Sequence, residues 1–81
     1  MTKEDIKSKG IPCDTLSKYK GAYTLRKSFF WKDSSSIEIS EKLKDNFPNV
    51  DILDTWDKYV PFRGGDTIKE GSHYGVKFIV K

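Results

Sequence analysis

Alternating apolar and polar residues predict three β-strands in this chain. Residues 22–31 place Tyr23 and Leu25 on one face of an extended backbone, and residues 74–80 alternate in the same way. Residues 50–60 are rich in β-branched and aromatic side chains, which favour strands, and a proline follows them. Within that last stretch we expect Val50, Ile52, Trp56 and Val60 to lie on one face of the strand.

Apolar residues four apart predict a helix between the first two strands. Ile39, Leu43 and Phe47 recur at helical spacing, and Pro48 follows them. Ser35 and Glu38 have the spacing of a capping box, which marks the start of a helix. We therefore expect a helix over residues 36–47.

The N-terminal part of the chain predicts less structure. Thr2 and Asp5 have a helix-start spacing, but Ile6 is the one strong apolar residue before Gly10, so residues 1–10 are expected to be frayed and flexible. Residues 15–20 carry Leu16 and Tyr19 three apart, and Gly21 follows as a possible helix cap. This pattern predicts a short N-terminal helix over residues 15–20.

Together these elements predict a single small α+β domain over residues 1–81. We expect a mostly antiparallel three-stranded sheet, with the main helix on one face and residues 62–72 as a loop before the last strand. The second face of the sheet is either open to a partner or covered by the short N-terminal helix.

The charge is distributed unevenly along the chain. The net charge is +3, but residues 15–32 carry +5 and residues 33–57 carry 7 acidic residues against 2 lysines. Five aromatic residues stand among the cations of the basic segment, which contains no acidic residue before residue 32. Such a surface suits phosphates, whose attraction to cations does not depend on sequence, or an acidic protein.

Composition argues against several other classes of protein. Cys13 is the one cysteine, so neither an intrachain disulfide nor a zinc site of several thiolates is expected, and the chain is expected to be cytoplasmic. No apolar stretch resembles a signal peptide or a membrane span. The argument for a catalytic pair of Cys13 and His73 depends only on each being the one residue of its type in the chain. We expect neither enzymatic activity nor a cofactor.

Three aspartates offer one alternative chemistry. Asp51, Asp54 and Asp57 recur every third residue and would share a helical face, as in a metal-dependent nuclease. The β-rich composition of this segment instead predicts a strand, on which Asp54 points away from the other two.

The predicted order strand, helix, strand, strand, together with His-Tyr-Gly-Val-Lys-Phe at residues 73–78, resembles the first half of an RNA recognition motif. The resemblance implies that sheet aromatics stack on RNA bases, with Tyr74 in that role. The chain departs from the family at Val76, where a second stacking aromatic would stand. It also lacks the basic residue and glycine before Tyr74, the second helix and the fourth strand.

We therefore expect a small basic module that binds RNA or another single-stranded nucleic acid. Arg63 precedes two glycines, a unit found in nucleic-acid-binding tails and also typical of a turn. The alternative is a protein-binding inhibitor or adaptor, of the kind that small phage genomes encode, acting through the basic surface or through the acidic helix. The candidate phosphate contacts are Lys18, Lys20, Arg26, Lys27, Arg63 and Lys77, and the candidate stacking rings are Phe30 and Tyr74.

Overall fold

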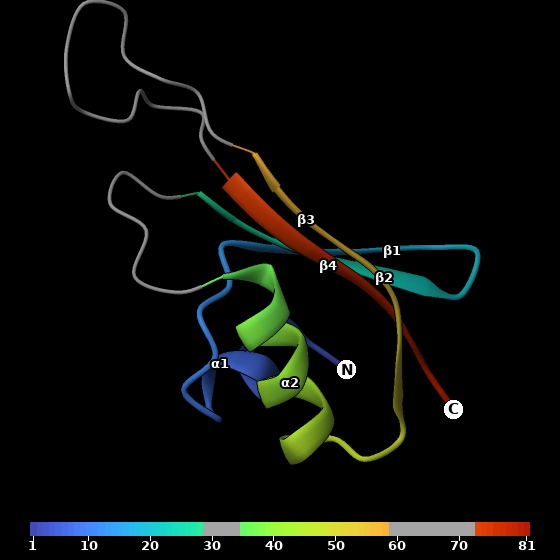
Figure 1. Cartoon of the computed structure of the whole chain (residues 1–81). Coiled ribbons are helices and arrows are strands. Elements are labelled where there is room, and N and C mark those ends of the chain that lie inside the picture. The colour runs from blue at the N-terminus through green and yellow to red at the C-terminus, as the bar shows by residue number, and fades with distance from the viewer. Residues whose placement is uncertain (29–34, 59–72) are drawn as a thin grey trace, which may run out of the picture.

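The computed structural model describes residues 1–28, 35–58 and 73–81. The strands form one antiparallel sheet in the order β1-β2-β4-β3, and both helices lie on the same side of it (Figure 1). The α+β class, the antiparallel sheet and the main helix are confirmed, while the sheet has four strands in place of the expected three. The elements are α1 (Lys3–Lys7), β1 (Thr15–Tyr19), β2 (Ala22–Ser28), α2 (Ser36–Asn46), β3 (Val50–Lys58) and β4 (His73–Val80).

The additional strand is β1, which occupies the segment predicted to be a short helix. It pairs antiparallel with β2 along its whole length, from Thr15 opposite Arg26 to Tyr19 opposite Ala22. Lys20 and Gly21 connect the two strands with φ angles of 49° and 82°. Two residues with positive φ match the twist of a tight β-hairpin. The helix prediction was wrong because two apolar residues three apart are weak evidence for a helix. The hairpin instead lets the backbone of β1 form hydrogen bonds with β2 along its whole length.

Helix α2 begins where the sequence predicts, because its first turn is capped from two sides. The Ser35 hydroxyl accepts a hydrogen bond from the Glu38 amide at 3.3 Å. Asp57 on β3 accepts from the Ser36 amide at 3.2 Å and from the Ser36 hydroxyl at 2.6 Å. These contacts fix the start of α2 against the sheet. Neither α2 nor α1 has the length and apolar character needed to cross a membrane.

Helix α1 forms within the segment predicted to be frayed. Thr2 and Asp5 make both bonds of a capping box, at 2.9 and 3.2 Å, and these offset part of the cost of so short a helix. Ile6 is 0% exposed and belongs to the same apolar cluster as Ile39 of α2. A single fully buried side chain therefore anchors α1 beside α2, so that α1 does not cover the second face of the sheet.

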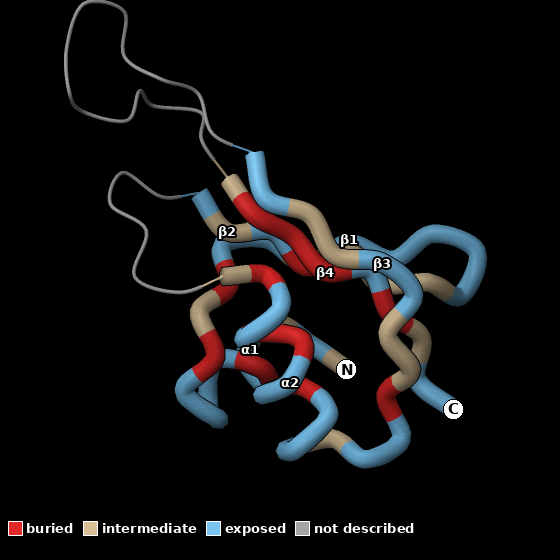
Figure 2. Tube along the Cα trace, viewed as in Figure 1, coloured by how far each residue is buried: buried red, intermediate tan, exposed pale blue. Residues whose placement is uncertain are grey.

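The hydrophobic core lies between the helices and one face of the sheet. Leu25 pairs with Val76 and Tyr23 pairs with Phe78 across β2 and β4, and all four point toward the helices. The rings of Tyr23 and Phe78 stack with centroids 5.3 Å apart. Buried positions follow β4 and the facing side of α2 (Figure 2).

A β-bulge in β3 changes which side chains face the core. Ile52 pairs with Phe78, but Asp54 pairs with Lys77, so Leu53 is an extra residue on this strand. Beyond the bulge Trp56 pairs with Gly75 and therefore lies on the sheet face opposite Val50 and Ile52. The prediction that Trp56 shares a face with Val50 and Ile52 was wrong, because one inserted residue reverses the alternation. Val60, the fourth residue of that prediction, lies outside the described residues.

Candidate functional site

The sheet face opposite α1 and α2 is the candidate functional surface, and we call it the outer face. None of the described elements covers it (Figure 1). Side chains that pair across neighbouring strands form four rows on it, with successive rows about 6.7 Å apart. These rows are Tyr19-Ala22-Ile79-Asp51, Ser17-Thr24-Lys77-Asp54, Thr15-Arg26-Gly75-Trp56 and Ser28-His73-Lys58.

Arg26 and Trp56 meet across the central strand β4. The guanidinium carbon lies 5.8 Å from the centre of the indole ring, within the range of a cation–π contact. The two residues are on β2 and β3, and Gly75 lies between them. A Cβ at Gly75 would overlap three indole carbons, two of them at 2.6 Å, so the absence of a side chain there allows the Trp56 ring to lie over β4. The glycine thus creates a position where an aromatic ring and a cation are held together.

The described outer face carries more positive than negative charge. Arg26, Lys58 and Lys77 are exposed cations on three different strands. Asp51 and Asp54 on β3 are the acidic residues, and Asp51 lies 3.7 Å from the ammonium group of Lys81. Because the two acids lie on an edge strand, the centre of the face is cationic.

Tyr19 adds an exposed ring that the sequence reasoning missed. It ends β1, and its side chain is 75% exposed on the outer face. The Lys20 ammonium group lies 5.4 Å from the centre of its ring. The prediction of a helix over residues 15–20 concealed this position. A strand joined to β2 by a two-residue turn at Lys20 and Gly21 places Tyr19 opposite Ala22, on the same face as Arg26.

The structure brings together only part of the predicted basic site. Arg26 and Lys77 lie on the outer face, and Lys20 lies at its edge, in the β1–β2 turn. Lys18 and Lys27 belong to the opposite face: Lys18 lies 5.1 Å from the ring centre of Tyr23, and Lys27 forms a 3.1 Å ion pair with Asp14. Phe30 and Arg63 lie outside the described residues.

Tyr74 does not join the outer face. It is 1% exposed and points toward the helices, in register with Lys27. A base cannot reach a ring that is enclosed by the protein core. The resemblance to an RNA recognition motif therefore supplies no stacking ring at this position.

The residues considered for catalysis do not converge. Asp51 and Asp54 are on the outer face, whereas Asp57 faces α2, so the prediction that Asp54 stands apart was wrong because of the bulge. Cys13 is buried in the core, where burial raises the pKa of its thiol, while His73 lies on the outer face. No group of three or more metal-ligating side chains occurs among residues 1–28, 35–58 and 73–81.

No protein-family model, curated protein or solved structure matches this chain. The chemistry and arrangement of the outer face are therefore the basis for inferring function.

Proposed function

We propose that the protein binds single-stranded nucleic acid through the outer face of its sheet. One observation carries the proposal: a sheet face that the described elements leave uncovered presents three cations around an indole, with an exposed tyrosine at one end. Cations attract the phosphates of any sequence, and aromatic rings stack on unpaired bases. A single strand supplies both of these groups.

The position of the aromatic rings favours a single strand over duplex. Tyr19 and Trp56 lie in rows separated by the row of Lys77, so a strand that crosses the face meets ring, cation and ring in turn. Bases in a duplex are stacked on one another, and their faces are unavailable to protein rings. Among the described elements the outer face is a broad sheet surface, and both described helices, which could otherwise enter a major groove, lie on its opposite side.

The first experiment is fluorescence anisotropy with labelled single-stranded RNA, single-stranded DNA and duplex across a range of salt concentrations. The test variant is Arg26→Met with Lys77→Met, and the matched control is Lys42→Met with Lys44→Met on exposed positions of α2. Each pair removes the same charge. Loss of two phosphate contacts lowers the slope of log affinity against log salt by about 1.4 for a single strand.

Tyr19→Ala tests the stacking part of the proposal separately from charge. The side chain is 75% exposed, so its removal leaves the fold intact. We expect single-strand affinity to fall by about 1–3 kcal/mol, the cost of one lost base–aromatic contact, with little change in the salt slope. The proposal fails if none of the nucleic acids binds at low salt, or if the control pair on α2 weakens binding as much as the outer-face pair.

An acidic protein surface is the second candidate partner, because the same cations would complement it. The alternative of an acidic helix is less well supported. Helix α2 carries three acidic residues, Glu38, Glu41 and Asp45, and also Lys42 and Lys44, so its net charge is small. Absence of nucleic-acid binding would direct the search to protein partners of the outer face.

A further inference from the structure

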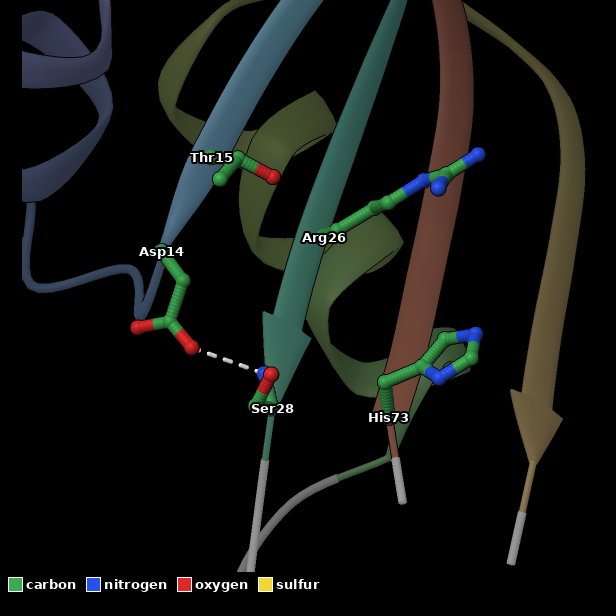
Figure 3. A pocket seen from close by; sticks show the side chains of 5 residues that line it. All are labelled: Asp14, Thr15, Arg26, Ser28 and His73. Atoms are coloured by element: carbon green, nitrogen blue, oxygen red, sulfur yellow. Dashed lines mark hydrogen bonds between the residues drawn. The ribbon is translucent and has the colours of Figure 1, made fainter. Parts of the chain in front are cut away.

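A shallow pocket lies at one end of the outer face, where β2 and β4 approach the limits of the described residues. Its volume is about 220 Å³. Arg26 and His73 extend from neighbouring strands over the same part of the sheet, while Asp14 lies on the far side of Ser28 (Figure 3). The lining residues are Asp14, Thr15, Arg26, Ser28 and His73.

The negative charge of Asp14, the acidic residue of this pocket, is compensated by its own contacts. Asp14 accepts hydrogen bonds from the Lys27 ammonium at 3.1 Å and from the Ser28 amide at 2.8 Å, one on each oxygen. Burial raises the pKa of the Asp14 carboxyl, but the bond from Ser28 and the nearby Lys27 outweigh it and hold the pKa below its usual value. Asp14 therefore stays ionised, and Lys27 compensates its charge.

The remaining lining groups are hydrogen-bond donors suited to an anion. Arg26 offers a planar guanidinium, which matches the oxygens of phosphate, and contact with Trp56 holds its side chain over the sheet. The hydroxyls of Thr15 and Ser28 add further donors, and the imidazole of His73 lines the same space. A small anion with several oxygens satisfies more of these groups than a base or a carboxylate does.

The volume of the pocket limits which part of a ligand can enter it. Pockets that take whole small molecules range from about 300 to 1,000 Å³, and this pocket is smaller. We propose that it binds one phosphate group of a nucleic-acid strand and so fixes where the strand lies on the outer face. This inference rests on the proposed function, and it adds a defined phosphate position to a surface that otherwise attracts the strand through general charge.

His73 provides a direct readout, because it is the single histidine of the chain. Its imidazole proton signal in an NMR spectrum is followed while sodium phosphate is added at fixed pH, with sodium chloride at matched ionic strength as reference. We expect a saturable shift with phosphate and none with chloride. Arg26→Met abolishes the shift, Thr15→Val weakens phosphate binding at least threefold, and Lys18→Met on the opposite face leaves it unchanged.

A second titration separates the two sources of phosphate. Single-stranded RNA hexamers with a 5′-phosphate or a 5′-hydroxyl are added to the wild-type protein and to Thr15→Val. If the terminal phosphate enters the pocket, the phosphorylated hexamer binds wild type at least fivefold more tightly, and the difference disappears in Thr15→Val. If a phosphate within the strand enters, both hexamers shift the His73 signal equally, and Thr15→Val weakens both.

The outcomes also separate this inference from the proposed function. The phosphate pocket is overturned if chloride shifts His73 as phosphate does, or if Arg26→Met leaves the phosphate shift intact. It is also overturned if the hexamers bind in anisotropy without affecting His73, and in that case the proposed function stands. A saturable response to phosphate with no binding of either hexamer would show an anion site in the pocket, but it would overturn both the assignment of that site to a nucleic-acid phosphate and single-strand binding.

Discussion

Replacing Gly75 by alanine tests the most unusual contact of the outer face. The new methyl group would overlap three carbons of the Trp56 ring, two of them at 2.6 Å, closer than real Cβ atoms approach other atoms. The backbone of β4 is paired on both sides, with Arg26 of β2 and with Trp56 of β3, and cannot move away. We therefore expect the indole to be displaced from its position over β4 and its contact with Arg26 to be lost.

The expected cost combines three effects of known size. Overpacking costs about 1–3 kcal/mol, and the lost cation–π contact adds about 0.5–1 kcal/mol. Alanine restricts the unfolded chain more than glycine does, which returns about 0.4–1 kcal/mol. Because Trp56 is partly exposed and can rotate outward, the low end of the overpacking range applies. The net expectation is a destabilisation of about 0.5–1.5 kcal/mol, or a decrease in Tm of about 2–12 °C for a domain of this size.

The assay is urea unfolding followed by circular dichroism for wild type, Gly75→Ala, Trp56→Ala and the double variant. In the Trp56→Ala background the methyl group meets no indole, so Gly75→Ala becomes neutral or slightly stabilising. The coupling energy between the two positions is expected to be about 1–3 kcal/mol. Equal destabilisation by Gly75→Ala in both backgrounds would refute the explanation that this glycine accommodates Trp56.

Three further predictions concern the start of α2, the packing of α1 and the contacts of Asp14. Asp57→Ala removes both hydrogen bonds to Ser36, which is 1% exposed. We expect it to lower the free energy of unfolding by about 1–3 kcal/mol in urea titrations. Asp57→Asn keeps an oxygen that can accept one of these bonds, so its loss of stability is expected to be smaller. Ile6→Ala is expected to cost about 2–4 kcal/mol, and a cost near zero would show that α1 does not pack as described. The lowered pKa of Asp14 means that its stabilisation is fully present well above pH 3.8 and is lost as the pH falls through the lower folded-state pKa. Asp14→Asn should therefore reduce the loss of stability in acid unfolding measured below pH 4, and an unchanged acid profile would contradict this account.

The sequence predicted the elements whose local signals agree with their packing. Helix α2 has a serine cap, a regular apolar spacing and a proline after its end, and its predicted start is confirmed. Strand β2 places Tyr23 and Leu25 on its core-facing side before Lys27 interrupts the alternation, and Leu25, in its centre, is fully buried. At such positions the backbone preference, the side-chain pattern and the core all favour the same structure.

The errors have specific physical causes. Strand β1 has too few apolar residues to show a period, so its structure depends on pairing with β2, which is a tertiary contact. Helix α1 buries only Ile6, and whether one residue is enough depends on the space left beside α2. The bulge at Leu53 has no local signature in the sequence, and it misplaced Trp56 and hence part of the candidate site.

The bulge also means that β3 belongs to two layers of the molecule. Its first half contributes Val50 and Ile52 to the core, and its second half contributes Trp56 to the outer face and Asp57 to the start of α2. Deletion of Leu53 would restore strict alternation, bring Trp56 beneath the helix and turn Asp57 away from Ser36. The one extra residue in β3 thus keeps its apolar side chains in the core and its indole on the surface.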